Sequence, residues 1–555
     1  MSSLLPERIL VCVAWPYANS LRHVGHVAGA YLPADIFARY HRLRGNETVM
    51  VSGSDCHGTP ITVSADKEGV EPRVIVDRYH AKIVETWERL GIQWECYTTT
   101  LTENHYATTQ EVFLKLLEKD YLYRKTQDQL YDPEANRFLP DRYVEGTCPK
   151  CGYGEARGDQ CDNCGSQMDA IDLINPRSRM TGATPVVRES EHYFLRLSAL
   201  EEGLKEWVAP KDHWRRNVQN FTLGMLNEGL IDRAITRDIA WGVPVPVEGW
   251  DEKRIYVWFD AVIGYLSATR EWAQRKGEPE DWRRFWEDPN ARSYYFIGKD
   301  NIPFHTVIWP AMLMGYGGLN LPFDVPANQY VNMPSGAKQS KSAGTGTGGL
   351  NLLDVYAPDA LRFYLTTIFP ETSDSVFSED DLIRTNNDVL IGTWGNLANR
   401  VISMIHRNFE GVVPESGGLA PEGAALLADA AAAFPTPAAE FEACHFRNAV
   451  QEAMRLAQAA NRYLDERAPW KAVKSDRDHA AQTLATALST INAIKTLLHP
   501  VIPFTTATLH EDLGFADTIG ERGWAFEPIA AGTQLRPARP LYTKIETAPA
   551  GAAGA

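Results

Sequence analysis

The sequence has 555 residues, of which 44% are hydrophobic and 23% are charged, and its formal net charge is −16. A chain of this length cannot be organised around one hydrophobic core, and we expect about three or four domains. The composition is typical of a globular enzyme. The acidic balance excludes a generally basic nucleic-acid coat, although a local basic patch can still bind a nucleic acid.

The N-terminus and the cysteines indicate the compartment. The short apolar run at the N-terminus is interrupted by Pro6, Glu7 and Arg8, which is unlike a signal peptide, and no apolar run is long enough for a membrane span. The chain has eight cysteines, and half of them are tightly clustered, which does not resemble an extracellular disulfide framework. We therefore expect a cytoplasmic protein.

The first predicted elements are a strand and a helix with two histidines. Residues 9–14 (ILVCVA) are typical of a buried strand, and Pro16 marks a loop. Apolar and small residues then recur at helical spacing through residue 37, so His23 and His26 lie on one face of the first helical turn. The free N–H groups and the partial positive charge at that end suit a phosphate group.

The chain then divides into segments of different composition. Strand-like and helical runs alternate at first, as in a parallel α/β sheet, and a second α/β stretch follows after turn-rich, aromatic pieces around a cysteine cluster. A glycine-rich loop and a long, mainly helical stretch come next, and we expect the alanine- and glycine-rich tail to be disordered. The predicted segments are 1–118, 119–236, 237–330, 331–381, 382–545 and 546–555.

The cysteine cluster is the most specific metal signal in the chain. Two CxxC pairs, Cys148 with Cys151 and Cys161 with Cys164, are separated by nine residues. Two such turns can place four thiolates tetrahedrally around Zn²⁺, at about 2.3 Å from each sulfur. The alternatives are a pair of redox dithiols or unrelated free cysteines. Because protein sulfurs fill every position, we predict one structural zinc ion and not a catalytic one.

The glycine-rich loop carries two lysines that could bind a polyphosphate. Lys338 and Lys341 lie in the stretch AKQSKSAGTG. Two lysines on such a loop could close over the phosphates and neutralise the charge of a leaving group. Taken alone, a solvated basic loop is the simpler interpretation, and the sequence contains neither a Walker A pattern nor a dinucleotide fingerprint.

Two motifs in this order carry a resemblance to a known family. HVGH at residues 23–26 resembles the HIGH signature of class I aminoacyl-tRNA synthetases, and KQSKS at 338–342 resembles their KMSKS signature. The stretches PYAN, DCHGTPI, TGATPV, YVWFDAVIGY, FIGKDNIPFH and APWKAVK are similar to those of the methionyl enzymes of this class. The resemblance extends from about residue 9 to residue 503.

The resemblance implies a fold, a reaction and partners. The fold is a Rossmann-type α/β catalytic domain with a parallel sheet, split by a zinc-binding insertion and followed by a stem-contact segment and an α-helical anticodon-binding bundle. The implied methionine–tRNA ligase uses ATP with Mg²⁺ to convert L-methionine into methionyl-adenylate and transfers it to the 3′ end of methionine tRNA. Neither DNA nor a membrane is an expected partner. We expect a monomer, because the extra C-terminal oligonucleotide-binding domain of some relatives has no counterpart here.

The same resemblance implies roles for individual residues, position by position. The residues implied to contact the ATP phosphates in catalysis are His23, His26, Lys338 and Lys341. Further residues implied to bind ATP are Gly25, Lys299 and Asp300. Those implied to bind methionine are Trp15, Tyr17, Asp55, Arg237, Trp258, Ala261, Tyr265 and His305. Those implied to read the anticodon are Asn396, Arg400 and Trp470.

For several of these residues, a purely structural role is the alternative to binding a substrate. Asp55 would pair with the methionine ammonium group, Arg237 with its carboxylate, and aromatic rings would enclose the thioether. Isolated aromatic residues are more often core residues. Asn396 and Arg400 are four residues apart and share a helix face, where a polar contact between helices is the alternative to base reading.

The chain departs from the family pattern at four positions. Trp15 stands where many relatives have Leu, and Val262 where Pro is usual. Gln339 replaces the Met of the lysine signature, and Cys56 stands where Ala or Glu is common. Gln339 leaves the lysine charges in place, whereas Trp15 and Val262 border the methionine pocket. Two other functions stay open: a paralogue that transfers an aminoacyl-adenylate to a small amine, and a non-catalytic tRNA-binding protein.

Overall fold

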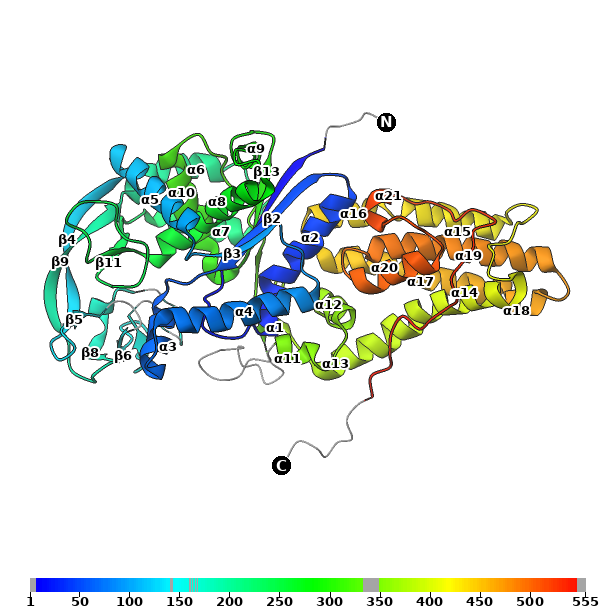
Figure 1. The fold of residues 1–555 in the computed structure, drawn as a ribbon, viewed down its shortest axis with the longest axis horizontal. Helices are drawn as coiled ribbons and strands as arrows, with labels where there is room; N and C mark the ends of the chain where they lie inside the picture. The colour runs from blue at the N-terminus through cyan, green and yellow to red at the C-terminus, as the bar shows by residue number, and fades with distance from the viewer. Residues whose placement is uncertain are drawn as a thin grey trace, which may run out of the picture.

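The computed structural model describes residues 6–139, 143–158, 161, 163–164, 166, 168–332 and 349–546. The chain forms an α/β lobe and an elongated lobe of helices (Figure 1). In these ranges, no helix is both long and apolar enough to cross a membrane. The lysine motif at 338–342 lies outside the described residues.

A parallel five-stranded sheet forms the centre of the α/β lobe. Its strands lie in the order β14-β13-β1-β2-β3, and every pairing between them is parallel. Their bounds are Arg8–Val13 (β1), Glu47–Ser54 (β2), Cys96–Thr99 (β3), Arg292–Gly298 (β13) and Ala327–Asn328 (β14). β1 pairs with β2 on one side and β13 on the other, so the strand order reverses next to β1. In open α/β sheets, ligands bind outside the carboxyl ends of the strands at such a reversal.

Alternating side chains of β1 explain why helices cover both faces of the sheet. Ile9 and Val11 point into one hydrophobic core and Leu10 and Cys12 into another, because successive side chains of a strand point to opposite faces. The helices that complete the first core include α2 (Leu32–Leu43) and α4 (Pro72–Leu90). Those that complete the second include α5 (Glu103–Glu118), α8 (Val257–Lys276) and α10 (Trp309–Tyr316). A strand buried on both faces has the continuous apolar run found here.

The connection from β3 to β13 carries the insertion. After α5 the chain forms an antiparallel sheet in the order β10-β9-β4-β5, a smaller sheet in the order β7-β6-β8, and the helices α6 and α7. The bounds are Leu122–Asp132 (β4), Arg137–Phe138 (β5), Val144–Thr147 (β6), Ala156–Arg157 (β7), Ile174–Ser178 (β8), Val186–Leu195 (β9), Glu201–Val208 (α6), Arg216–Glu228 (α7) and Arg233–Ala234 (β10). The strands of the insertion lie at the end of the α/β lobe that is away from the helical lobe (Figure 1).

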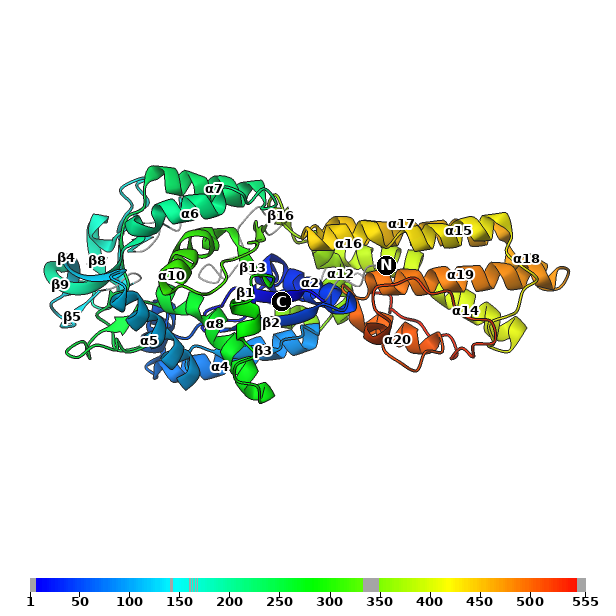
Figure 2. The ribbon, with the colours of Figure 1, turned by 90° about the horizontal axis from the view of Figure 1, so that it is seen from above.

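The helical lobe is built on long helices that lie side by side. α17 and α19 run along the lobe next to α15, and the short α18 connects them at the far end (Figure 2). The bounds are Pro358–Thr367 (α12), Glu379–Arg384 (α13), Thr385–Gly395 (the π-helical η7), Asn396–Phe409 (α14), Pro421–Ala432 (α15), Pro435–Glu442 (α16), Phe446–Arg467 (α17), Pro469–Ala472 (α18), Arg477–Leu498 (α19), Pro503–Asp512 (α20) and Ile519–Arg522 (α21). The predicted fold class, a parallel α/β sheet with an insertion followed by a helical bundle, is therefore confirmed.

Candidate active site

The helix that carries the two histidines begins where the strand order reverses. β1 ends at Val13, and His23 is the N-cap residue of α1 (Val24–His26), which continues through the π-helical η1 (Val27–Tyr31) into α2. The predicted strand and helix, with both histidines at the helix start, are confirmed. The imidazole centroids of His23 and His26 are 3.7 Å apart. The start of this long helical run offers N–H groups and a partial positive charge to an anion.

Gly25 packs against the ring of His23. A Cβ atom at Gly25 would lie 3.0 Å from the ring of His23 and 3.6 Å from the carbonyl oxygen of Val331. Any larger residue would therefore press on the His23 ring. The missing side chain therefore leaves room for the His23 ring at the helix start.

Arg22 fixes the loop between β1 and the histidine helix, although no motif points to it. Its side chain is 1% exposed. The Nη2 group donates hydrogen bonds to the carbonyl oxygens of Tyr17 at 3.0 Å and of Ser20 at 2.5 Å. These bonds hold the loop in the shape that sets Tyr17 relative to the helix start.

Ring side chains form three contacting pairs in the predicted methionine pocket. The Tyr17 ring meets Trp258 edge-on, with 6.5 Å between the ring centroids, and Trp258 stacks on Phe304 at 4.1 Å. The hydroxyl of Tyr265 lies 2.7 Å from Nε2 of His305. Trp258 and Tyr265 both lie on α8, which also carries the small residue Ala261.

The pair of Tyr265 and His305 is polar but uncharged. Burial lowers the pKa of His305 to about 4 and raises the pKa of Tyr265 well above its ordinary value. The other ring nitrogen, Nδ1 of His305, lies 2.9 Å from the carbonyl oxygen of Asn301, which can only accept. Nδ1 therefore carries the proton, and Nε2 accepts from the Tyr265 hydroxyl. A soft thioether is compatible with such a neutral surface.

Trp15 is wedged between two glycines. A Cβ atom at Gly53 in β2 would lie 2.3 Å from the indole of Trp15, and one at Gly264 in α8 would lie 2.6 Å from it. Only residues without a side chain leave room for this indole. Trp15 therefore fills the space between β2 and α8 next to the pocket helix.

Asp55 places a buried carboxylate directly after β2. Its backbone N–H donates to the carbonyl oxygen of Pro16, and its own carbonyl accepts from Ala18, both at 2.9 Å. The carboxylate accepts a hydrogen bond from the backbone N–H of His57 at 3.1 Å, and the residue is 3% exposed. Burial and then the charge of Asp260 raise the pKa of Asp55. A bound ammonium group would oppose both effects.

Lys299 and Asp300 follow β13 and share a tyrosine as partner. They lie in the short helix η5 (Lys299–Asn301) at the carboxyl end of the strand. The Lys299 ammonium lies 3.0 Å from Oδ1 of Asp374 and 3.9 Å from the ring centroid of Tyr330. The Tyr330 hydroxyl donates a hydrogen bond to Asp300. Tyr330 thus links both predicted ATP-binding residues, although no motif pointed to it.

The position of Arg237 in the structure differs in kind from that of the two signature lysines, which the structure does not describe. Arg237 donates to the carbonyl oxygen of Ala234 at 3.0 Å, and its guanidinium lies 3.8 Å from the ring centroid of Tyr256. Its contact with the substrate carboxylate stays a prediction. Lys338 and Lys341 lie outside the described residues.

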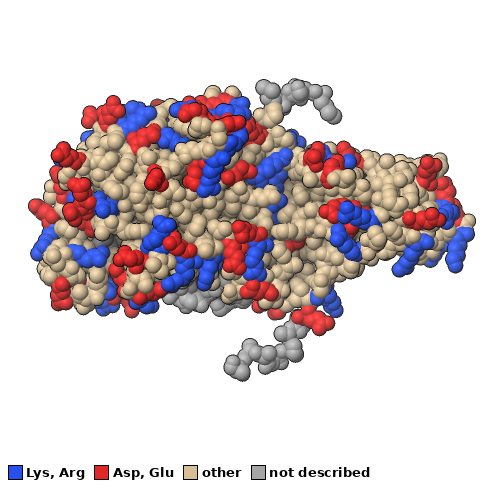
Figure 3. Space-filling view, in the orientation of Figure 1, with Lys and Arg blue, Asp and Glu red and all other residues tan. Residues whose placement is uncertain are grey.

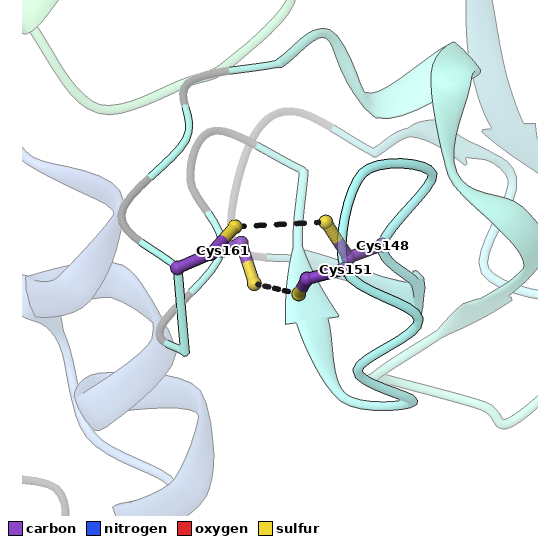
Figure 4. A group of neighbouring side chains, drawn as sticks. Cys148, Cys151 and Cys161 are labelled. Carbon is purple, nitrogen blue, oxygen red and sulfur yellow. Dashed lines mark hydrogen bonds between the residues drawn. The ribbon is translucent and has the colours of Figure 1, made fainter.

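The four cysteines come together in the insertion (Figure 4). The sulfurs of Cys148 and Cys164 are 3.9 Å apart, those of Cys151 and Cys161 are 3.6 Å apart, and all four lie within 4.8 Å of one another. A tetrahedral Zn²⁺ with sulfurs at about 2.3 Å requires sulfur–sulfur distances of about 3.8 Å. The cluster therefore fits a metal ion such as zinc.

The surroundings of the cysteines shift their pKa values in both directions and connect the cluster to the catalytic lobe. Hydrogen bonding with Ser166 lowers the pKa of Cys164 to about 6, whereas burial raises the pKa of Cys161 to about 11. The neighbouring Tyr143 donates a hydrogen bond to Asp66 at 2.7 Å, and Asp66 belongs to α3 (Thr59–Glu68), which follows the Asp55 turn. A metal in the cluster would therefore support a module that rests on the pocket side of the lobe.

The predicted anticodon residues lie in the helical lobe. The predicted common face of Asn396 and Arg400 is confirmed, because both lie four residues apart in α14. The Arg400 guanidinium is 5.5 Å from the ring centroid of Trp470, which is 41% exposed. Lys and Arg side chains are visible at this end of the molecule, mixed with acidic ones (Figure 3). An exposed ring beside a guanidinium can stack on and hydrogen-bond to an unpaired base.

Comparison with known proteins identifies the family. The family model described as "tRNA synthetases class I (M)" matches residues 9–402, and the model "Anticodon binding domain of methionyl tRNA ligase" matches residues 413–551. The chain belongs to the methionyl-tRNA synthetase family. The resemblance inferred from the sequence motifs is therefore confirmed, and so is the methionine–tRNA ligase activity that it implied.

Members of the methionyl-tRNA synthetase family match the chain along its length. The methionine–tRNA ligase of Dehalococcoides mccartyi is 52% identical over 542 residues, which cover 98% of this chain and 98% of that protein. That of Thermomicrobium roseum is 49% identical over 569 residues, covering 98% and 97%. The crystal structure of Mycobacterium tuberculosis methionyl-tRNA synthetase bound by methionyl-adenylate is 26% identical, with a TM-score of 0.81, and covers 97% of this chain and 100% of that one.

The structure adds partners, four of them buried, to the residues expected from the methionyl-tRNA synthetase motifs. These partners are Arg22, His57, His105, Asp260 and Tyr330. His57 lies inside the motif DCHGTPI and Asp260 inside YVWFDAVIGY. These two motifs could have indicated both residues from the sequence. Arg22, His105 and Tyr330 carry no such signal, because their contacts arise only from the folded arrangement.

Proposed function

We propose that the chain activates L-methionine and transfers it to methionine tRNA in one pocket at the carboxyl ends of β1, β2 and β13. The methionine carboxylate attacks the α-phosphate of ATP, which forms methionyl-adenylate and releases pyrophosphate. A terminal hydroxyl of the tRNA then attacks the adenylate carbonyl, and AMP leaves. One observation supports this most strongly: the helix start with the two histidines and the aromatic pocket with its buried carboxylate meet around one loop, residues 14–22.

The protein would catalyse activation by positioning and by charge, because phosphoryl chemistry of this kind needs little covalent help. His23 and His26 would contact the phosphates at the helix start, and Lys338 and Lys341 would neutralise the departing pyrophosphate. Mg²⁺ bound with ATP would screen the phosphate charges. Lys299 and Asp300 would hold the rest of the nucleotide at the end of β13.

The pocket would select methionine by its shape and by the uncharged polar pair of Tyr265 and His305. Tyr17 and Trp258 would enclose the thioether from the side of the loop, and the Tyr265–His305 pair would contact it from the opposite side. Asp55 would bind the ammonium group, and Arg237 the carboxylate. Zinc in the cysteine cluster would hold the insertion together and take no part in the reaction.

Transfer to tRNA would use both lobes. Trp470 would stack on an anticodon base while Asn396 and Arg400 hydrogen-bond to it, and the acceptor end would reach the pocket in the α/β lobe. The protein would act as a monomer. A tRNA substrate and free cysteines fit a cytoplasmic location.

Pyrophosphate exchange with each of the twenty amino acids tests the proposal. Methionine should support exchange far better than any other amino acid. His26→Ala should slow methionine-dependent exchange by about 10²–10³, because a donor to the reacting phosphates is lost. The matched control is His213→Ala, which removes an exposed histidine bonded to the carbonyl oxygen of Phe323. Exchange that another amino acid drives better, or that His26→Ala leaves unchanged, would contradict the proposal.

A further inference from the structure

Two imidazoles surround a buried carboxylate behind the predicted methionine pocket. Asp260 lies in the first turn of α8 and is 0% exposed. Its Oδ2 lies 2.7 Å from Nδ1 of His57, and its Oδ1 lies 3.4 Å from Nε2 of His105. Both histidines are buried, so the contacts are shielded from water. None of these three residues has a role in the reaction proposed above.

The contacts of His57 indicate which ring nitrogen carries a proton. Nδ1 faces a carboxylate, which accepts, so Nδ1 carries the proton. Nε2 lies 3.2 Å from the hydroxyl of Tyr106 and accepts from it when the ring is neutral. Asp260 and Tyr106 therefore fix the imidazole plane from two sides.

His57 is also hydrogen-bonded to Asp55. The backbone N–H of His57 donates to Oδ1 of Asp55 at 3.1 Å, which is the pattern of an Asx turn. His57 is thus held at its backbone by one carboxylate and at its ring by the other. Because Oδ1 of Asp55 is engaged by the turn, Oδ2 is the oxygen that we assign to the substrate ammonium.

Stability alone does not explain this cluster. A buried ionised carboxylate is costly unless it is paired, and replacing buried ion pairs by apolar residues is often neutral for stability. Burial acts to raise the pKa of Asp260, but His57 and then His105 outweigh this effect and lower it. An ionised Asp260 near Asp55 makes the pocket favour a cation.

We propose that His57 and Asp260 are positioning residues for the substrate ammonium group: Asp260 orients His57, and His57 holds the turn that aims Asp55 at the substrate. The inference rests on the proposed function, in which Asp55 binds that ammonium. It predicts that the two residues affect ligands with an ammonium group and spare ligands without one.

A comparison of two ligands tests this prediction. The dissociation constants of L-methionine and of its des-amino analogue, 4-(methylthio)butanoate, are measured by calorimetry on the full chain. Asp260→Asn and His57→Gln should weaken L-methionine binding by about 10- to 100-fold, as expected when a charged hydrogen-bond partner is misplaced. The analogue should bind each variant within about twofold of the unaltered protein, because it lacks the ammonium group. His41→Asn is the matched control, since His41 is a buried histidine of α2 that is bonded to Asn46.

Asp55→Asn separates the possible failures. If Asp260 acts through Asp55, Asp260→Asn should add little to the loss already caused by Asp55→Asn. Unchanged methionine binding in Asp55→Asn would show that the proposed role of Asp55 is wrong. If Asp55→Asn weakens binding but Asp260→Asn affects both ligands equally, or adds its full effect to Asp55→Asn, the cluster is structural and the positioning role is wrong. Tyr106→Phe removes only the hydroxyl that faces His57 and gives a milder variant for the same comparison.

Discussion

At the scale of single residues, local motifs predicted the histidines and aromatic side chains but not the groups that support them. His23 and His26 follow a strand directly, so the sequence order itself places them at a helix start. Arg22 binds carbonyl groups whose positions depend on the folded loop. Asp260 lies 203 residues from His57, and no local pattern encodes a contact of that range.

Gly264 tests whether the indole of Trp15 shapes the pocket. Gly264→Ala would place a methyl group 2.6 Å from the indole, so Trp15 has to move. We expect a loss of about 1–3 kcal/mol in the free energy of unfolding, as for other overpacked cores, and a higher KM for methionine. Thermal unfolding and pyrophosphate exchange measure the two effects.

Gly224→Ala in α7 is the control for Gly264→Ala, because nothing lies within 4 Å of a Cβ atom there. It should leave KM unchanged and stabilise the helix by up to about 1 kcal/mol. The double variant Gly264→Ala with Trp15→Leu should recover stability, since the smaller side chain leaves room for the methyl group. Failure of Trp15→Leu to rescue would mean that the strain lies elsewhere.

At the scale of elements, spacing and periodicity predict some features and not others. The spacing of the two CxxC pairs predicted the cysteine cluster, because each pair closes a tight local turn. The π-helical stretches η1 and η7 were not predicted. They continue the helices on either side, so the apolar pattern shows no break at which a different hydrogen-bond register would be recognised.

Loss of one cysteine should release the metal and loosen the insertion. Cys151→Ser removes one of four sulfurs, and the small core around Cys148 and Cys161 has few other apolar residues to hold β6, β7 and β8. Elemental analysis should find about one zinc per unaltered chain and almost none in the variant, and limited proteolysis should cut within residues 143–178. Cys96→Ser, a buried cysteine outside the cluster, should keep its zinc. Zinc-free protein prepared without chelator would refute the site.

At the scale of the whole molecule, one buried arginine joins the two lobes. The Arg362 guanidinium in α12 lies 2.6 Å from Oδ2 of Asp35 in α2, and it also donates to the carbonyl oxygens of Leu90 and Val501. Asp35 and Arg362 are 327 residues apart and 0% exposed. The sequence could not predict this joint, because its partners come from three distant segments. These buried hydrogen bonds hold the helical lobe in a fixed position relative to the pocket.

Because of this fixed arrangement, a substitution at Trp470 can test tRNA recognition without affecting amino-acid activation. Trp470 is exposed on α18, in the lobe that does not carry the pocket, so Trp470→Ala should leave pyrophosphate exchange nearly unchanged. If the ring stacks on an anticodon base, the variant should lose about 1–3 kcal/mol of tRNA binding. Aminoacylation efficiency should then fall about fivefold or more, since 1.36 kcal/mol is a factor of ten.

Leu419→Ala provides the control for Trp470→Ala, because Leu419 is an apolar side chain of the same lobe with 54% exposure. It should change neither exchange nor charging. If Trp470→Ala slows exchange as much as it slows charging, the residue supports the fold and does not read tRNA. If the unaltered protein activates methionine but charges no tRNA, transfer to a small amine becomes the better account. The two assays together therefore locate any failure in one lobe or the other, because activation needs only the α/β lobe, whereas charging needs both.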